Sequence, residues 1–412
     1  MVVLATPTGL LAQGVPLGPE FRVNTYITFQ QEGGDVAFDP AGNFVIVWTD
    51  WSAHAGGNGA DVLGQRYASS GAPLGGEFRI NSYTTGNQFL GPRSSVSCDS
   101  TGNFVVVWNS YNQDGSIFGV YAQRIASTGA PLGGEFRVNT TTIGFQFLPS
   151  VASDSVGNFI VVWGSNAVGS DPDVFGQRYT STGVPLGGEF RINTYTTGSQ
   201  GGPTVARAAS GHFVVVWTSV HDGYGTGVFA QRYDNSGLPL GPEFRVNSFT
   251  PFFQEGPAIA ADPAGNFVIA WTSLNQEGSG QGVFAQRFAS TGPAMGGEFR
   301  VNTFTTSYQR EPSAASDSAG NFVIAWMSYG QDGSDYGVFA QRYSNTGAPV
   351  GSEFRVNSYR TNTQYFPEVA ADPLGTFVIV WTSYTQDGSL QGVYAQRYSM
   401  IVPVELQDFR LE

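Results

Sequence analysis

An apolar run that recurs seven times is the feature that most restricts how this chain can fold. The run reads GNFVVVW or a close variant, and seven of the eight tryptophans in the 412 residues end it. These tryptophans are Trp48, Trp108, Trp163, Trp217, Trp271, Trp326 and Trp381. After its first two residues the run is wholly apolar and rich in β-branched and aromatic types, so it predicts a strand covered on both faces. Such a strand lies between two others.

Three further motifs keep step with the tryptophan run and complete a repeat of four strands. We name these strands A (PxVAxD, as at 149–154), B (the tryptophan run), C (VFAQRY) and D (GEFRVN). The DPAGN type of sequence between A and B, as at 39–43, predicts a tight hairpin. The glycines and proline of STGAPLGG predict a turn between C and D as well. Helical periodicity is absent. Each repeat is therefore expected to be an antiparallel meander.

Seven meanders whose strands are apolar on both faces predict sheets packed radially into a ring. The expected fold is all-β, a seven-bladed β-propeller of four-stranded antiparallel blades over residues 20–398, between a lead-in (1–19) and a tail or junction (399–412). A D motif at 20–24 precedes the first A strand, and no full D motif follows the last C strand. The amino-terminal strand is thus expected to close the ring beside 393–398. The alternative closing segment is Asp408-Phe409-Arg410.

Charge and composition exclude several classes of partner. The formal net charge is −13, and every basic residue is arginine. Without a basic stripe, nucleic acid is not an expected partner. No apolar run approaches the length that spans a bilayer, so membrane insertion is not expected either. Cys98 is the single cysteine, which excludes a disulfide framework.

The repeated charges suggest how strands C and D are aligned. Pairing Arg66 with Glu77 places opposite charges face to face, whereas pairing Arg66 with Arg79 opposes like charges. We therefore expect the first register, with a structural role for these arginines.

The loops are the predicted location of function. In a meander the A–B and C–D turns share one face of the ring, and the longer, more varied D–A and B–C loops share the other. Aromatic side chains follow strand B, and acidic residues occupy loops of the QDGS type; rings and planar polar groups are what sugar recognition uses. The candidate ligand-binding residues are Trp51, Tyr111, Tyr329, Tyr384, Asp114, Asp222, Glu277, Asp332 and Asp387. The competing interpretation makes each QDGS a turn whose Asp bonds its own backbone, and makes the aromatics fillers between blades.

Metal binding and catalysis receive less support. Calcium sites use several carboxylates, whereas each QDGS loop offers one. Asp171 and Asp173 form the densest pair and are the candidate calcium ligands; no other cofactor is expected. The histidines have no partner pattern, and no HExxH or GxSxG motif occurs. The chain is therefore expected to be non-enzymatic, although carboxylates from different blades could assemble a glycoside-hydrolysing pair.

Taken together, the motifs GNFVVVWTS, QDGS, GVFAQRY and STGAPLGGEFRVN resemble repeats of large secreted and cell-surface bacterial proteins, including calcium-binding, adhesin-like exoproteins. The resemblance covers nearly the whole chain and implies an extracellular repeat module without catalytic residues. The expected function is lectin-like binding or adhesion at the bacterial surface, with glycans or surface proteins as partners. The alternatives are a spacer without a small ligand and a polysaccharide-active enzyme.

Overall fold

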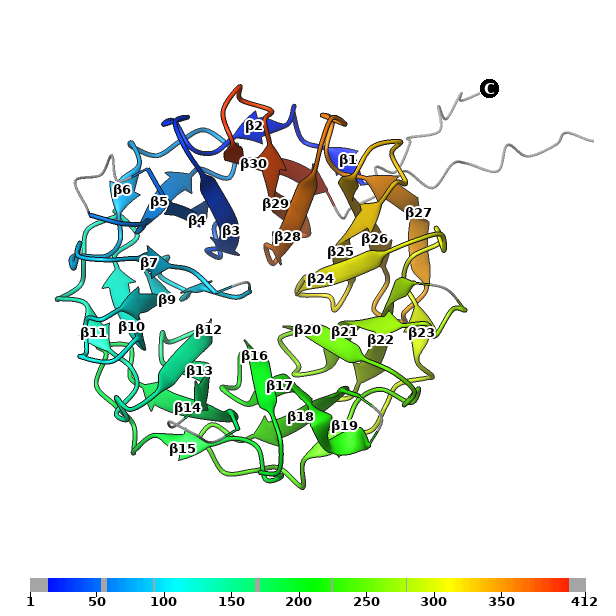
Figure 1. Cartoon of the computed structure of the whole chain (residues 1–412), viewed down its shortest axis with the longest axis horizontal. Helices are drawn as coiled ribbons and strands as arrows, with labels where there is room; N and C mark the ends of the chain where they lie inside the picture. Colours follow the sequence, from blue (N-terminus) through cyan, green and yellow to red (C-terminus); the bar gives the residue numbers. More distant parts are fainter. Residues whose placement is uncertain are drawn as a thin grey trace, which may run out of the picture.

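The chain folds into β-sheets arranged around a central axis (Figure 1). The structure is a computed structural model that describes residues 14–52, 58–91, 93–166, 171–223, 225–278 and 280–399. Within these ranges all regular elements are strands, except for the 3-10 helix η1 (Val220–Asp222). Hydrogen bonding groups the strands into six sheets.

Four of the sheets have four strands each, in the order A, B, C, D from the axis to the rim. The first contains β3 (Gln31–Phe38), β4 (Phe44–Asp50), β5 (Asp61–Tyr67) and β6 (Phe78–Arg79). The next two contain β16 (Gln200–Arg207), β17 (Phe213–Ser219), β18 (Gly227–Tyr233) and β19 (Phe244–Arg245), and then β20 (Gln254–Ala261), β21 (Phe267–Leu274), β22 (Gln281–Phe288) and β23 (Phe299–Arg300). The fourth contains β24 (Gln309–Ser316), β25 (Phe322–Tyr329), β26 (Tyr336–Tyr343) and β27 (Pro349–Arg355).

A fifth sheet joins the two ends of the chain. It contains β28 (Gln364–Ala371), β29 (Thr376–Tyr384) and β30 (Gln391–Ser399), with β1 (Val15–Pro16) and β2 (Phe21–Arg22) at its outer edge. Phe21 pairs with Ala395, and Val15 pairs with Ser399, both antiparallel. The amino-terminal strand thus lies where the repeat pattern expects the outer strand of the last sheet. The alternative segment, 408–410, lies outside the described residues.

The sixth sheet is double and corrects the expected blade count. It has nine strands: β7 (Gln88–Phe89), β8 (Val96–Cys98), β9 (Phe104–Tyr111), β10 (Phe118–Ile125), β11 (Phe136–Arg137), β12 (Phe145–Ser153), β13 (Phe159–Asn166), β14 (Asp173–Tyr179) and β15 (Phe190–Arg191).

The prediction of seven separate four-stranded blades is therefore wrong. Five sheets are separate blades, and the second and third repeats share the nine-stranded sheet. A parallel contact between Phe118 and Phe145 joins them. Similar parallel bridges join Gln391 to Gln30 and Gln281 to Tyr308, but there one partner lies outside a strand. Phe118 and Phe145 both belong to strands, because β12 begins one residue earlier than the other A strands, so this bridge merges the two repeats into one sheet.

The hydrophobic core lies between neighbouring sheets, as a strand covered on both faces requires. Along β4, Val45 and Val47 pack toward the second repeat, whereas Ile46 and Trp48 pack toward the last one. All seven strand-B tryptophans are fully buried. Because each large side chain contributes roughly 1.5–3 kcal/mol on burial, these contacts dominate the cohesion of the ring.

The charged residues of strands C and D link neighbouring repeats, which corrects the expected register. In the β5–β6 pair, Leu63 faces Arg79 and Gly64 faces Phe78, so the proposed pairing of Arg66 with Glu77 is wrong. The cause is that these side chains reach across to adjacent sheets. In the third repeat, Glu189 Oε2 accepts from the backbone N–H of Thr140, 2.7 Å away in the preceding repeat. Arg124 Nη1 donates to Thr182 O of the following repeat, also at 2.7 Å.

Candidate functional site

The exposed aromatic side chains of the described residues all lie on one side of the ring. We call the side that carries the D–A and B–C loops the loop face, and the opposite side the turn face. Nine exposed rings of the described chain lie in D–A loops, at the start of an A strand or at the end of a B strand, all on the loop face. They are Phe29, Tyr111, Phe145, Phe252, Phe253, Tyr308, Tyr329, Phe366 and Tyr384. Exposed apolar residues of the turn face, such as Leu74, Leu238 and Leu374, are aliphatic.

Three of the four aromatic candidates present accessible rings. Tyr111, Tyr329 and Tyr384 end strands β9, β25 and β29 and are 38%, 40% and 38% exposed. Trp51 is less exposed, because its Nε1 donates to Glu32 Oε1 at 2.9 Å and its ring stacks on Phe89. These side chains therefore combine packing with an accessible face.

The acidic candidates described by the structure accept hydrogen bonds from their own loop or from the D motif of the same repeat. Asp114 Oδ1 accepts from the backbone N–H of Ser116 at 3.0 Å, and Asp332 and Asp387 make the same contact two residues on. Glu277 Oε2 accepts from Asn302 Nδ2 at 3.3 Å. Burial raises the pKa of Glu277, and this hydrogen bond opposes the rise. The contacts give these carboxylates a structural role, and their part in ligand binding stays a prediction.

Asp222 ends η1, and its side chain lies outside what the structure describes.

In the first and third repeats, whose loops lack the QDGS acidic residue, a carboxylate on strand C makes the equivalent contact. Asp61 and Asp173 lie at the start of β5 and β14, and each accepts from the Asn of its D motif at 2.6 Å. In the second repeat this strand position is Gly119, where an added Cβ would lie 2.6 Å from Asp114 Oδ2. The carboxylate therefore comes either from the loop, with a glycine on the strand, or from the strand itself.

The calcium candidates do not form a cluster. Asp173 is engaged by Asn193 and lies 3.9 Å from Arg191, while Asp171 is exposed. Among the described residues there is no group of three or more His, Cys, Asp and Glu side chains placed to hold a metal ion.

The repeat pattern breaks at the axis, where four charged residues form what we call the axial cluster: Asp35, Arg93, Glu311 and Glu368. One position of strand A is acidic in the first and seventh repeats, at Asp35 and Glu368, and small in the other five, as at Ser150, whose Oγ accepts from Val205 N at 3.2 Å. Asp35 has the same place and accepts from the N–H of Val96 at 3.0 Å.

The carboxyl groups of Asp35 and Glu368 are both buried. Burial raises the pKa of Asp35 to about 6, although hydrogen bonds from backbone N–H groups oppose the rise. The pKa of Glu368 is also raised, first by burial and then by the charge of Asp35. Ser313 Oγ donates to Glu368 Oε2 at 2.8 Å.

Arg93 comes from a segment, 91–93, that the other A strands lack. It donates to Pro257 O at 3.1 Å and forms an ion pair with Glu311 at 2.5 Å, and its side chain is 10% exposed. The second repeat and strand β24 lie on opposite sides of the axis (Figure 1), so Arg93 reaches across it. Sequence reasoning missed this residue, although the longest spacing between D motifs, from Phe78 to Phe136, contains the extra segment.

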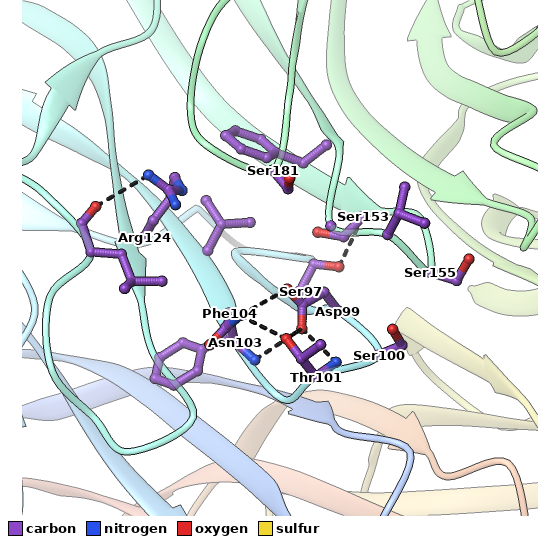
Figure 2. Close-up of a pocket in the computed structure, with 15 residues that line it drawn as sticks. Ser97, Asp99, Ser100, Thr101, Asn103, Phe104, Arg124, Ser153, Ser155 and Ser181 are labelled. Carbon is purple, nitrogen blue, oxygen red and sulfur yellow. Dashed lines mark hydrogen bonds between the residues drawn. The ribbon is translucent and has the colours of Figure 1, made fainter.

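The turn face has cavities where neighbouring repeats meet (Figure 2). One of about 280 Å³ lies between the second and third repeats, and its lining includes Asp99, Asn103, Arg124, Ser155 and Ser181. Cavities of about 330 and 370 Å³ have the same place between the first and second and between the fifth and sixth repeats. No sequence motif predicted a site on this face.

The fold and these faces define a β-propeller. No family model matches the chain, and no curated protein matches its sequence. The adhesin-like repeat type is therefore not established, whereas the propeller fold is.

Solved structures share the fold at low sequence identity. A protein of unknown function from Dyadobacter fermentans DSM 18053 has a TM-score of 0.56 at 10% identity, covering 94% of this chain and 98% of its own. The β-propeller domain of the Trilobed protease from Pyrococcus furiosus has a TM-score of 0.51 at 8% identity, covering 93% and 100%. An α-L-arabinanase from Penicillium chrysogenum, complexed with arabinobiose, has a TM-score of 0.50 at 13% identity, covering 74% and 93%.

The comparison corrects the expectation of a non-enzymatic chain. A structure with this fold is an arabinanase, so the fold itself is compatible with catalysis. Short contiguous motifs are a poor guide here, because residues from separate sheets converge at the axis. Identities this low show the fold alone and transfer no activity. Among the described residues no helix is long and apolar enough to cross a membrane.

Proposed function

We propose that the protein binds carbohydrate chains through its loop face, as a secreted or cell-surface protein of a bacterium. The observation that carries the proposal is the confinement of the nine exposed rings to this face. Aromatic rings stack on the apolar C–H faces of sugars, and exposed apolar patches mark interaction sites. Attachment to glycans or glycosylated surface proteins would make the protein an adhesion module.

Polar groups beside the rings complete the chemistry that a sugar requires. Gln30 and Gln391 are joined through Nε2 and Oε1 at 2.7 Å, and Asn362 Nδ2 donates to Thr385 Oγ1 at 2.7 Å. Such amides offer paired donors and acceptors to hydroxyl groups. The net charge of −13 opposes acidic polysaccharides. Neutral glycans are therefore the favoured class.

The test compares a loop-face variant with a turn-face variant. The Tyr329→Ala, Tyr384→Ala double variant removes two accessible rings, each worth about 0.5–1.5 kcal/mol, so binding should weaken roughly 5-fold to 150-fold. The matched control, Leu238→Ala with Leu374→Ala, removes two exposed side chains of the turn face. A glycan array followed by affinity electrophoresis on neutral polysaccharides provides the measurement. Equal binding by both variants would contradict the proposal, and a silent array with the wild type would favour a spacer.

A second candidate function, hydrolysis of the bound chain, is favoured by one observation at the axis. Desolvation raises the pKa of Glu255, and the charge of nearby Glu311 raises it further. Glu311 itself is paired with Arg93. Two carboxyl groups in such different surroundings are suited to acid and base roles in glycoside hydrolysis. Release of reducing ends by the wild type, lost in Glu255→Gln with unchanged glycan binding, would support this function, and no release from bound polysaccharide would exclude it.

A further inference from the structure

The turn-face cavities are a product of the repeat. Each is bounded by the A–B turn and the strand-C arginine of one repeat and by the A–B turn of the next. The three cavities have equivalent lining groups. They are Asp39, Asn43 and Arg66 in the cavity after the first repeat, Asp99, Asn103 and Arg124 in the cavity after the second, and Asp262, Asn266 and Arg287 in the cavity after the fifth. The same chemistry therefore recurs around the ring.

The cavity between the second and third repeats is lined both by polar groups held in place by hydrogen bonds and by exposed hydroxyl groups. Asp99 Oδ1 accepts from the N–H groups of Thr101 and Asn103 at 2.8 and 3.0 Å, which holds the turn in place. Ser155 and Ser181 bring exposed hydroxyl groups from the next repeat (Figure 2). Hydroxyl groups both donate and accept, so they suit a ligand that carries hydroxyls itself.

The remaining lining sets the charge and shape of the ligand. The carboxylate of Asp99 and the guanidinium of Arg124 leave the cavity close to neutral, which favours an uncharged ligand over an ion. The side chains of Phe104 and Phe159 add an apolar wall. A volume of about 280 to 370 Å³ is at the small end of ligand pockets and suits a single sugar unit or a similar polyol.

We propose that these inter-repeat cavities of the turn face are a set of equivalent binding sites for small neutral polyhydroxy ligands. The sites are separate from the loop face and do not depend on the function proposed for it. Repetition of one site around the ring raises the avidity for a ligand that is itself repeated, without any new contact.

The fourth repeat carries a natural blocking group. Arg207, from β16, lies between the third and fourth repeats with a side chain that is 3% exposed. It donates to Asn158 O at 2.8 Å and to Asn235 Oδ1 at 3.0 Å, and it pairs with Asp154 at 3.0 Å. These partners are the counterparts of Asn103, Ser181 and Asp99. The guanidinium therefore occupies the position that is open in the other three places.

The residue that matches Arg207 lines each open cavity. It is Ser153 between the second and third repeats, Ser316 between the fifth and sixth, and Cys98 between the first and second. Ser153→Arg should therefore fill its cavity as Arg207 does, with Asp99 as the partner. The reverse change, Arg207→Ser, should open a further cavity.

The experiment counts bound ligand. Equilibrium dialysis of the whole protein against radiolabelled glucose, galactose, mannose and glycerol, each at millimolar concentrations, gives the number of molecules bound per chain. We expect more than one equivalent of at least one probe for the wild type, one fewer for Ser153→Arg and one more for Arg207→Ser. Ser316→Arg is the second blocking variant, in case Ser153→Arg does not fold, with circular dichroism to check folding.

The outcomes separate this proposal from loop-face binding. The Tyr329→Ala, Tyr384→Ala variant should keep the turn-face stoichiometry while its polysaccharide binding weakens. No saturable uptake of any probe by the wild type overturns the proposal. So does a stoichiometry that stays constant in folded Ser153→Arg, Ser316→Arg and Arg207→Ser, because ligand would then bind elsewhere.

Discussion

Asp35 places a negative charge in the interior at a position where the third and sixth repeats have Ser150 and Ser313. Burial raises its pKa from 3.8 to about 6. Because the folded state holds this proton more tightly, the contribution to stability is complete below pH 3.8 and is lost as the pH rises through 6. At neutral pH the ionised group therefore weakens the fold.

We expect Asp35→Ser to stabilise the protein at pH 7, by about 1–3 kcal/mol in the free energy of unfolding. Serine keeps an acceptor for the next repeat, as Ser150 does for Val205. The gain should shrink toward pH 4, where the aspartate is protonated. Urea unfolding at both pH values measures it, with the exposed Asp335→Ser as control. A variant less stable than the wild type at pH 7 would show that the hydrogen bonds to Asp35 outweigh its desolvation.

Residues that have the same role in several repeats could be predicted from the sequence. Residues that meet only where strands converge at the central axis could not. The QDGS turn, its backbone hydrogen bond and the accessible tyrosines follow from local patterns. Asp35, Glu368 and Arg93 matter because strands from distant repeats converge on one line, and no local pattern encodes that convergence. Glu311 meets Arg93 across the ring, a contact that only the closed fold creates.

At the scale of a strand and its loop, the repeats show two exchangeable ways to place one carboxylate. Gly119→Ala should destabilise the second repeat, because the new Cβ would lie 2.6 Å from Asp114 Oδ2. A cost of about 1–3 kcal/mol is expected for such overpacking. Combining Asp114→Gly with Gly119→Asp recreates the arrangement of Asp61 and Asp173 and should recover most of the loss. Calorimetric melting tests both; a double variant no more stable than Gly119→Ala would refute the exchange.

The outer strand of the last sheet is a second element with a testable role. Val23 N–H donates to Val393 O at 2.8 Å, and Val393 N–H donates to Asn24 Oδ1 at 2.7 Å. Removing residues 1–24 deletes these bonds and the burial of Phe21 and Val23, and leaves β30 as an unprotected edge. We expect a lower melting temperature and concentration-dependent association in size-exclusion chromatography.

The peptide 14–24 added in trans is the control for this truncation. It should restore the melting temperature if β2 and its neighbours act by covering β30. A truncated protein that melts like the full chain and stays monomeric would contradict a closing role.

Strand order and turn chemistry could be predicted from the repeat, whereas the sheet count could not. A single parallel bridge between Phe118 and Phe145 merges two repeats into one sheet because both residues lie within strands, whereas similar bridges at other junctions involve a residue outside a strand. The two-residue pairing of the D strands other than β27 is equally absent from the motif, because EFRVN is longer than the part that pairs. A repeat motif therefore predicts the strands within a repeat better than it predicts the length of the outer strand or the pairing between neighbouring repeats.

At the scale of the whole molecule, the proposed sites point in opposite directions. Rings on the loop face suit an extended glycan, and the cavities of the turn face suit single sugar units. A rigid ring with both kinds of site acts as a bridge between two glycan-bearing surfaces, because the faces are separated by the full length of the strands. Bridging is a property of the assembled ring that neither site has alone.

We therefore expect the wild type to aggregate beads coated with a polysaccharide that the loop face binds and that ends in the sugar the cavities take. The Tyr329→Ala, Tyr384→Ala variant should aggregate the beads less, because its loop face binds the polysaccharide more weakly. A triple variant, Ser153→Arg with Ser316→Arg and Cys98→Arg, fills the three open cavities and should leave the protein bound to single beads but unable to join them. Turbidity and the amount of bead-bound protein, measured together, distinguish these cases. Aggregation that persists in the triply blocked variant would mean that bridging comes from self-association of the rings rather than from two binding faces.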